Sequence, residues 1–519
     1  MKKMKKILAM LLALTMLMGL GMTAMAVEDP EESETPTYIT VPSGEDKAEI
    51  KVTGLPEAVT TVTAYQIVDA DYYDADDEEV GFKEYIAVSG VSIGDPTKPT
   101  AAEVAEIAND IALGNITTLV SKPLSKNGDG SFSTQAEAGY WLVIVNPVGH
   151  HVFNPMLAGV YYENTNGSGN TITGGTIDST KPWKLNGVTT VAKQSETTVE
   201  KEIVNPSTGN KLGDDVAIGE DIQYKVTADI PVYSEEMYKD VTFKVTDTLG
   251  EGISFLDNSN VTVKVSGNES ALVESENTYT ASINGQVLTV DFADRFVFDN
   301  GGKEVTITYM AELNENALHD NNPNDNEVEL IYTRKPGEDT TSEPKITHHY
   351  TFDVDFKKLD ANNKATALEE AEFTLYKNAE CTQVYTNDAH PDGKVTSGRG
   401  GSFTVKGLDS GSYYLKETKA PTGYQLDNTV HKLDVHTKFA SDGTLEAYEI
   451  VFDEGLIVET YKAGATSNAQ PRIIEITNTK LIALPSTGGI GTTIFTVAGC
   501  GIMIAAAFFF FASRKKENE

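Results

Sequence analysis

The stretch "GSYYLKETKAPTGYQLD", residues 411–427, places a carboxylate where a β-strand would bury it. Side chains alternate between the two faces of a strand, so Tyr413, Leu415 and Glu417 share one face. Tyrosine and leucine at alternate positions indicate that this face belongs to a core. Burying an unpaired carboxylate is costly, so the presence of Glu417 on this face requires a physical reason.

Strand-like segments extend on both sides of this stretch, from about residue 49 to residue 480. They are rich in β-branched and aromatic residues and are separated by Gly, Asn and Asp, as in "VTAYQIV", "DIQYKVTADI" and "EVTITYMAEL". One segment differs, because "TAAEVAEIANDIAL" at 100–113 has the apolar spacing of a helix. The sequence predicts a mostly β fold of tandem sandwich domains, with a short helix in the first domain.

Composition divides the 519-residue chain into three exported domains. A polar stretch at 164–182 loosens the chain near the end of the first segment, and the charged loop 333–345 ends the second. We therefore expect a first domain over 27–185, a middle domain over 186–344 and a third domain over 345–480.

Both ends of the chain carry targeting signals. Residues 1–26 carry four lysines among the first six positions, continue through an apolar stretch and end in Ala-Met-Ala, which is typical of a cleaved secretory signal peptide. The alternative is an uncleaved N-terminal membrane helix. At the other end, an uncharged run precedes Arg514-Lys515-Lys516, which predicts a transmembrane helix over 490–512. The chain is expected to be exported and held in a membrane.

Charge and cysteine content exclude several classes of function. The net charge of −36 is spread along the exported part, which argues against a nucleic-acid partner. The chain has two cysteines, Cys381 and Cys500, and Cys500 lies within the predicted membrane span. Without disulfide bonds, an exported strand-rich protein is either stabilised in another way or is stable enough without cross-links.

The residues give little support for an enzyme or a metal site. No Ser/His/Asp constellation suggests itself, and the eight histidines do not have the spacing of metal ligands. The acidic stretch 69–79 resembles a calcium loop in composition but lacks the central glycine and the ligand spacing. We therefore expect no cofactor and no metal.

A lysine, an acid and an asparagine recur at positions that alternate with apolar residues in the middle and third segments. The sets are Lys358, Glu417 and Asn478 in the third segment, and Lys201, Asp247 and Asn326 in the middle segment. Residues 314–330 are crowded with asparagines, and Asn326 is chosen because it leads directly into the closing strand.

Three such groups meeting in an apolar core indicate a specific reaction. Burial lowers the pKa of a lysine, which then becomes a neutral nucleophile, and raises the pKa of a carboxyl, which can then be protonated. The acid can polarise the carboxamide and shuttle protons while the amine attacks and ammonia leaves, which forms a Lys–Asn isopeptide bond. The alternative is that these residues are exposed at strand ends or form ordinary ion pairs.

Two motifs carry a resemblance to a known family. "YYLKETKAPTGY" (413–424) resembles the E-box of Gram-positive pilins, and "LPSTGG" (484–489), with the apolar span and basic tail, resembles the cell-wall sorting signal read by sortase. Together they resemble the SpaA-type backbone pilins of sortase-assembled fimbriae over nearly the whole chain. The sorting signal would occupy 484–519.

The resemblance implies Ig-like, CNA-B-like domains that carry isopeptide bonds. The implied bonds are Lys358–Asn478, assisted by Glu417, and Lys201–Asn326, assisted by Asp247. The first segment departs from the pattern, because "AGYWLVIVNPV" (138–148) occupies the place of an E-box but has no acid. No internal cross-link is expected there.

The resemblance also implies how subunits are joined. Sortase would cut the motif Leu484-Pro485-Ser486-Thr487-Gly488 between Thr487 and Gly488, and a lysine of the next subunit would accept Thr487. "WKLNGVTTVAKQS" (183–195) resembles the family's pilin motif approximately, which favours Lys193 as the accepting lysine. Lys181 and Lys184 are the rivals.

The function that the resemblance implies is structural rather than enzymatic. The chain is expected to be secreted and anchored to peptidoglycan as a subunit of a covalently polymerised pilus. Its expected partners are copies of itself, sortase and the peptidoglycan precursor, while accessory pilins and host surface ligands stay open. The alternative is a monomeric wall-anchored adhesin or an accessory or tip pilin, which would share the anchor and the isopeptide bonds but would not use Lys193.

Overall fold

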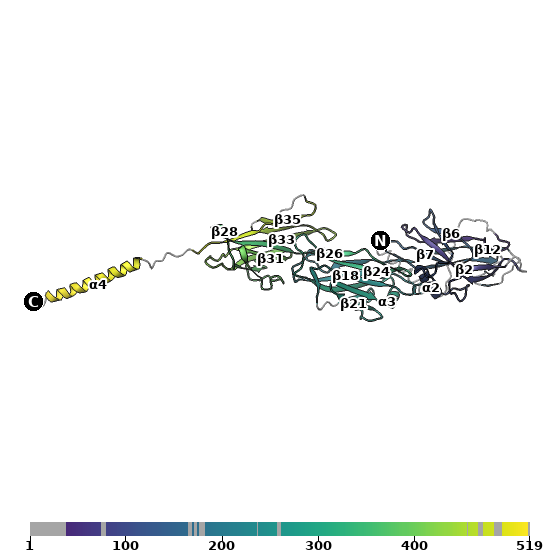
Figure 1. Ribbon diagram of the computed structural model, residues 1–519, viewed down its shortest axis with the longest axis horizontal. Coiled ribbons are helices and arrows are strands. Elements are labelled where there is room, and N and C mark those ends of the chain that lie inside the picture. The colour runs from purple at the N-terminus through teal and green to yellow at the C-terminus, as the bar shows by residue number, and fades with distance from the viewer. Residues whose placement is uncertain are drawn as a thin grey trace.

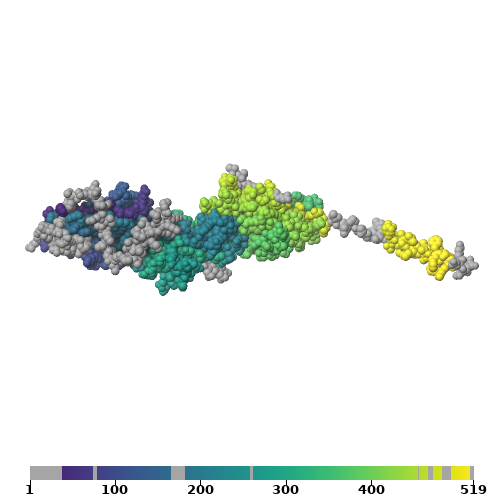
Figure 2. Space-filling model, turned by 180° about the vertical axis from the view of Figure 1, so that it is seen from behind, coloured from purple at the N-terminus to yellow at the C-terminus, as the bar shows by residue number. Residues whose placement is uncertain are grey.

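Three strand-rich domains follow one another along the long axis of the molecule, and helix α4 (Ile490–Lys516) lies beyond the third (Figure 1). The view from behind shows the same elongated row, with the middle domain between the other two (Figure 2). The computed structural model describes residues 38–73, 79–164, 169–170, 174–175, 182–235, 237–256, 261–453, 455–465, 471–481 and 490–516. The predicted signal peptide and the motif 484–488 lie outside these ranges.

The first domain is a sandwich of two sheets around aliphatic and aromatic side chains. Its strands are β1 (Ala48–Thr53), β2 (Val62–Tyr72), β3 (Phe82–Ala87), β4 (Ser121–Pro123), β5 (Ser125–Lys126), β6 (Phe132–Ala136), β7 (Gly139–Val145), β8 (His151–Phe153), β9 (Met156–Asn164), β10 (Gly169–Asn170), β11 (Gly174–Gly175), β12 (Trp183–Asn186) and β13 (Val188–Val191). One sheet has the order β13-β1-β6-β5, and the other has the order β11-β10-β9-β7-β2-β3, with β12 against β9 and β4 against β2. Buried and partly exposed residues alternate along β9, as expected for a strand with one face on a core.

The predicted helix of the first domain is confirmed as α2 (Ala101–Ala112). Thr100 caps its N-terminus, because the Thr100 hydroxyl accepts from the Glu103 amide while the Glu103 carboxylate accepts from the Thr100 amide. Such a cap stabilises a helix by about 1 kcal/mol. Val104 and Ile107 form its buried face, as the apolar spacing requires.

The middle domain is a second sandwich with one continuous core. Its elements are β15 (Val199–Ile203), β16 (Gly213–Asp215), β17 (Asp221–Asp229), β18 (Phe243–Leu249), β19 (Ile253–Phe255), β20 (Thr262–Val265), β21 (Tyr279–Asn284), β22 (Val287–Phe292), α3 (Asp294–Asp299), β23 (Glu304–Leu313), β24 (Asn324–Lys335), β25 (Glu338–Thr341) and β26 (Lys345–Tyr350). One sheet has the order β15-β17-β23-β19, with β20 also on β23. The facing sheet has the order β16-β26-β24-β18-β22-β21, with β25 on β24.

The third domain repeats the two-sheet arrangement. Its elements are β27 (Phe352–Asp360), β28 (Asn363–Ala367), β29 (Glu372–Tyr376), β30 (Lys394–Thr396), the 3₁₀ turn η1 (Arg399–Gly401), β31 (Ser402–Leu408), β32 (Gly411–Lys419), β33 (Val430–Phe439), β34 (Leu445–Phe452), β35 (Leu456–Lys462) and β36 (Ile474–Asn478). One sheet has the order β28-β27-β31, with β36 also on β27, and the other has the order β30-β29-β32-β33-β34-β35. The strand β32 contains the first part of the stretch 411–427, including Glu417.

Strand pairing extends the first two domains beyond the predicted boundaries. β13 pairs in parallel with β1, and β14 (Gln194–Glu196) pairs with β8, so first-domain pairing continues past residue 185. In the same way β26 pairs with β24, which carries the middle domain past residue 344. The predicted boundaries were too early, because a polar loop can precede a closing strand of the same domain instead of ending the domain.

Helix α4 contains an apolar stretch, Thr493–Arg514, of 22 residues with a mean hydropathy of 2.3. This stretch is long and apolar enough to cross a membrane. It agrees with the predicted span over 490–512, and its basic end contains Arg514 as expected.

Candidate functional site

The third domain brings Lys358, Glu417 and Asn478 together in its core, where each is at most 2% exposed. The Lys358 Nζ lies 3.1 Å from Glu417 Oε1. The Asn478 Nδ2 donates a hydrogen bond of 2.9 Å to Glu417 Oε2. The prediction that these three residues face inward is confirmed. Glu417 contacts the lysine with one carboxylate oxygen and the asparagine with the other.

Strand register explains this meeting. β27 and β36 are parallel neighbours in which Lys358 lies opposite Ile476 and Asp360 lies opposite Asn478. Two residues along a strand return to the same face, so Lys358 and Asn478 point into the sandwich together. β32 belongs to the opposite sheet and presents Glu417 from across the core.

The segment after β32 holds the acid and the amide in place. The Asp427 backbone amide donates to Glu417 Oε2 at 2.7 Å, and the Asn478 Nδ2 also donates to the Gln425 carbonyl at 2.8 Å. Sequence reasoning missed both backbone contacts, because they depend on the path of a loop rather than on strand alternation. The stretch 411–427 thus supplies an acid together with the loop that orients it.

The third-domain cluster has unsatisfied polar atoms as long as its residues stay separate. Lys358 Nζ and Glu417 Oε1 are close but are not aligned for a hydrogen bond. Asn478 Oδ1 is buried and has no hydrogen-bond partner among the described residues. A buried polar atom without a partner costs about 1–3 kcal/mol, so a reaction that changes these groups would relieve the core.

The middle domain assembles its own cluster from Lys201 on β15, Asp247 on β18 and Asn326 on β24, all at most 2% exposed. Lys201 Nζ forms an ion pair with Asp247 Oδ2. Asn326 Oδ1 is buried and lacks a hydrogen-bond partner in the described part of the chain. The prediction that these three residues face inward is confirmed. The choice of Asn326 as the bonding asparagine stays a prediction.

A tyrosine that sequence reasoning missed completes the middle-domain cluster. The Tyr309 hydroxyl on β23 accepts hydrogen bonds from Lys201 Nζ at 2.9 Å and from Asn326 Nδ2 at 2.8 Å. The same hydroxyl donates to Asp247 Oδ1 at 2.7 Å. The signal was present in the strand pattern, since Ile307 and Tyr309 alternate onto the buried face and a buried tyrosine hydroxyl needs partners.

Burial prepares both clusters for proton transfer. Desolvation lowers the pKa of Lys358 and of Lys201, and the facing carboxylates oppose this shift. Desolvation also raises the pKa of Asp247, against the effect of the Lys201 charge. Because these shifts favour the neutral forms, moving a proton from ammonium to carboxylate costs less here than in water.

Aromatic rings pack against both lysines. Lys201 Nζ lies 4.8 Å from the centroid of the Tyr224 ring and 5.4 Å from that of Tyr309. In the third domain, Lys358 Nζ lies 5.0 Å from the centroid of the Phe373 ring. These rings are buried and keep water from the amine, which makes the amine a better nucleophile once it is neutral.

A buried histidine packs behind the middle-domain cluster. His349 on β26 is fully buried, and its Nε2 lies 2.7 Å from the Tyr224 hydroxyl. Burial lowers the pKa of His349 to about 3, and the nearby charges of Lys201 and His348 act in the same direction. His349 is therefore neutral at physiological pH.

The low pKa of His349 predicts acid sensitivity of the middle domain. His349 binds a proton near pH 6.5 in the unfolded chain but only near pH 3 in the folded domain. The contribution of His349 to the free energy of unfolding is therefore fully present above pH 6.5 and decreases as the pH falls from 6.5 towards 3. The loss is about 1.4 kcal/mol per pH unit. In urea titrations at several pH values, His349→Gln should remove this part of the slope. Parallel curves for the two proteins would contradict the prediction.

Lys193 is exposed in the short connection between β13 and β14, at the junction of the first and middle domains. Its backbone carbonyl accepts a hydrogen bond of 2.9 Å from the Asn154 amide, so the connection is tied to the first domain. Lys184 is also exposed, on β12, while Lys181 lies outside the described residues. Both described lysines are accessible to an enzyme.

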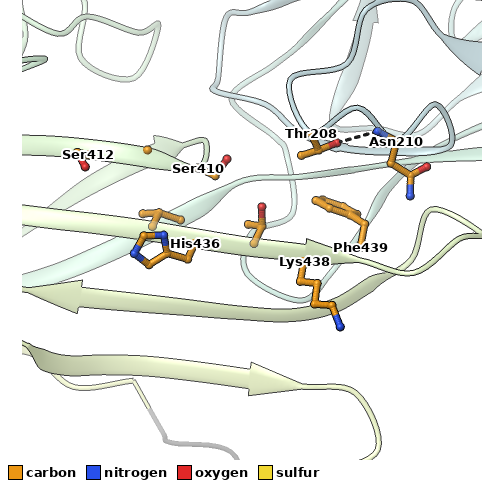
Figure 3. Close-up of a pocket in the computed structure, with 10 residues that line it drawn as sticks. Thr208, Asn210, Ser410, Ser412, His436, Lys438 and Phe439 are labelled. Carbon is orange, nitrogen blue, oxygen red and sulfur yellow. Dashed lines mark hydrogen bonds between the residues drawn. The ribbon is translucent and has the colours of Figure 1, made fainter.

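A separate cavity of about 580 Å³ lies between the middle and third domains. Figure 3 shows Thr208 and Asn210 on one side and residues of two neighbouring strands, including His436 and Phe439, on the other. No residue of the two lysine–acid–asparagine clusters lines this cavity.

Among the described residues, no group of His, Cys, Asp and Glu side chains is placed to hold a metal ion. Residues 74–78 of the acidic stretch lie outside the described part, so the prediction of no metal stays a prediction.

Comparison with family models matches most of the chain. Residues 45–194 match a T6 antigen Ig-like domain, 218–336 a Gram-positive pilin backbone subunit 2 Cna-B-like domain, 352–449 a SpaA prealbumin-like fold domain, and 476–519 an LPXTG cell wall anchor motif. The chain is built of Gram-positive backbone-pilin domains and ends in a cell-wall anchor. The predicted resemblance to SpaA-type backbone pilins is confirmed, and the middle and third matches contain Asn326 and Glu417, respectively.

Two relatives are similar to this backbone pilin over most of its length. It is 27% identical to the trypsin-resistant surface T6 protein of Streptococcus pyogenes serotype M6, over 97% of this chain and 99% of that protein. The solved T6 backbone pilin of serotype M6 S. pyogenes, described as a modular three-domain structure, matches with a TM-score of 0.61 at 22% identity, over 85% of this chain and 100% of the other. The structural match supports the fold. With the anchor match, the comparisons identify a structural pilin of the cell surface rather than an enzyme.

Proposed function

We propose that this pilin is the shaft subunit of a covalent polymer, joined by sortase between Thr487 and Lys193 of the next subunit. Two internal isopeptide bonds, Lys201–Asn326 and Lys358–Asn478, would stiffen each subunit. The observation that carries the internal chemistry is the enclosure of both lysine–acid–asparagine clusters in dry cores. Sortase, the peptidoglycan precursor and further copies of the chain are the implied partners, while accessory pilins and host ligands are not identified.

The third-domain geometry supports bond formation without an added reagent. Lys358 Nζ passes a proton to Glu417, and the neutral amine attacks the Asn478 Cγ. The tetrahedral adduct then transfers a proton from Nζ to Nδ2, for which the carboxyl group that contacts both nitrogens is suited. The Cγ–Nδ2 bond breaks, ammonia leaves, and a neutral secondary amide replaces the buried charge.

The positions of the bonds suit a shaft under tension. In the third domain, Lys358 is on the first strand and Asn478 on the last, so a pull along the chain enters and leaves the domain at the cross-linked strands. In the middle domain, the bond likewise joins the opening strand β15 to the closing part of the domain, β24. Force would then pass through covalent bonds instead of unravelling the strands between them.

The exposed position of Lys193 supports its role as the accepting amine. It lies at a domain junction, away from the C-terminal domain that precedes Thr487 in sequence, as head-to-tail joining of subunits requires. The alternative function, a monomeric adhesin or an accessory or tip pilin, keeps the anchor and the internal bonds but leaves Lys193 unused. Denaturing gels of wall extracts separate the two, because a shaft subunit gives a ladder of covalent multimers and an adhesin does not.

The internal bonds predict a definite mass for the exported chain. Residues 27–487 should be lighter than the sequence mass by two ammonia molecules, because each bond expels one. Intact-mass spectrometry checks the deficit, and digestion should give one linked peptide pair with Lys201 and Asn326 and another with Lys358 and Asn478. An unchanged mass would contradict the proposed internal bonds and leave the wall anchor unaffected.

A further inference from the structure

We propose that the Tyr309 hydroxyl is a catalytic group in the middle domain, where it relays a proton from Lys201 Nζ to the departing Nδ2 of Asn326. This inference rests on the proposed Lys201–Asn326 bond and adds a third participant to it. Among the described residues, Tyr309 is the side chain that forms hydrogen bonds with both the attacking and the leaving nitrogen.

The hydrogen bonds of Tyr309 use its full capacity. A phenol hydroxyl has one hydrogen to donate and two lone pairs to accept with. Here the hydrogen points to Asp247 Oδ1, while Lys201 Nζ and Asn326 Nδ2 both donate to the oxygen. The Tyr309 hydroxyl is therefore hydrogen-bonded to the base Asp247, to the nucleophile Lys201 and to the leaving group of Asn326.

The two clusters differ in a way that explains why a tyrosine is needed in one of them. In the third domain, Glu417 reaches Lys358 with one oxygen and Asn478 with the other. In the middle domain the acid is an aspartate, which is shorter by one methylene group, and Asp247 reaches the Asn326 amide through the Tyr309 hydroxyl.

The aromatic neighbours show the same difference. The ring against Lys358 belongs to Phe373, which has no hydroxyl, whereas the rings against Lys201 belong to tyrosines. In the third domain, the glutamate alone connects the lysine and asparagine nitrogens, next to a phenylalanine. In the middle domain, the aspartate connects the corresponding nitrogens together with a tyrosine.

The relay is balanced at each step. Lys201 first gives one proton to Asp247, and its lone pair then forms a bond to Asn326 Cγ, with the charge moving to Oδ1. Once Asp247 is protonated, the Tyr309 hydroxyl turns its hydrogen from Asp247 Oδ1 towards Nδ2. Nζ then gives a proton to the Tyr309 oxygen while the Tyr309 hydrogen passes on to Nδ2. The Cγ–Nδ2 bond breaks and ammonia leaves. Asp247 ends as a neutral carboxylic acid beside a neutral amide, and Tyr309 ends as it began.

Packing keeps Tyr309 in place and neutral during the relay. Its ring centroid lies 5.2 Å from that of Tyr224 at an interplanar angle of 30°, and 5.6 Å from that of Phe255. Burial and the Asp247 charge raise the pKa of Tyr309 well above its usual value, so the hydroxyl retains a proton. A fixed, neutral hydroxyl can accept one proton and release another without becoming an anion.

The test is the rate of ammonia loss in Tyr309→Phe, in the chain 27–487 with all three domains. Samples from cell-free synthesis are quenched at intervals, and the Lys201–Asn326 and Lys358–Asn478 peptides are quantified by mass spectrometry. General acid–base groups typically contribute at least about 100-fold, so we expect the middle-domain bond to form at least about 100-fold more slowly. The third-domain bond should form at the wild-type rate, which controls for synthesis and folding.

Tyr233→Phe is the matched control, because it also removes a buried hydroxyl from the middle-domain core. The Tyr233 hydroxyl donates to the Thr333 carbonyl at 2.6 Å and forms no hydrogen bond with the cluster. The middle-domain bond should form in this variant as fast as in the wild type. Slowing of the same size in both variants would assign the effect to lost packing and overturn the relay.

The outcomes separate the relay from the proposed function. A wild-type chain without the Lys201–Asn326 bond overturns both. A wild-type chain with the bond and an equally fast Tyr309→Phe variant overturns the relay alone. If Tyr309→Phe unfolds the middle domain, the double variant Tyr309→Phe/Asp247→Glu decides, because the longer acid can contact Asn326 Nδ2 directly. Restored bond formation in this variant supports the relay. A folded middle domain without the bond overturns the relay.

Discussion

In Glu417→Gln, the third domain is expected to remain without its cross-link, so the mass deficit relative to the variant's own sequence mass falls from two ammonia molecules to one. Glutamine fills the same volume but cannot take the Lys358 proton or protonate the leaving nitrogen. Lys358 and Asn478 should then appear in separate peptides, while the Lys201–Asn326 pair stays linked. Glu417→Ala should show the same deficit of one ammonia molecule relative to its own sequence mass.

The missing bond should also lower the stability of the third domain. A cross-link between the first and last strands closes a loop of more than about 100 residues, and a disulfide over such a loop stabilises by roughly 5 kcal/mol. In a domain of this size, the loss corresponds to a drop in Tm of more than about 10 °C. Differential scanning calorimetry measures the drop directly.

Glu459→Gln offers a matched control in the same domain. Glu459 is also buried and accepts a hydrogen bond from the Tyr448 hydroxyl, but it does not contact Lys358 or Asn478. The bond should form in this variant and the Tm should fall much less than in Glu417→Gln. A Glu417→Gln chain that keeps the wild-type ammonia deficit would refute the role of the acid.

Lys193→Arg is expected to abolish the ladder of covalent multimers in the producing cell while wall-attached monomer remains. Arginine keeps the positive charge, but its guanidinium stays protonated and cannot attack the acyl group at Thr487. The anchor is separate from Lys193 in the sequence, so attachment to the wall should continue. Immunoblots of wall extracts with an antibody against the chain measure both outcomes.

Lys184→Arg is the matched control for polymer formation, because Lys184 is another exposed lysine near the same domain junction. This variant should give the wild-type ladder. A ladder that survives Lys193→Arg but disappears in Lys184→Arg would move the linkage to Lys184. A wild-type strain with monomer alone would favour the adhesin or accessory pilin.

Much of this pilin was predictable from local patterns. Alternation along single strands was enough to place Glu417, Lys358 and Asn478 on inward faces, because the face of a residue in a strand depends only on its neighbours in sequence. The helix at 101–112, the apolar span near the C-terminus and the sorting signal are equally local. The family comparisons agree with the resemblance that two short motifs carried.

The tertiary structure alone decided which inward-facing residues meet. Tyr309 is 62 residues from Asp247 in sequence, and their contact depends on how two sheets stack across the core. The same holds for the parallel pairing of β27 with β36 and for the strands that close the first two domains. Strand alternation determines a direction, but the partner across a core depends on long-range pairing and register, which no short stretch of sequence encodes.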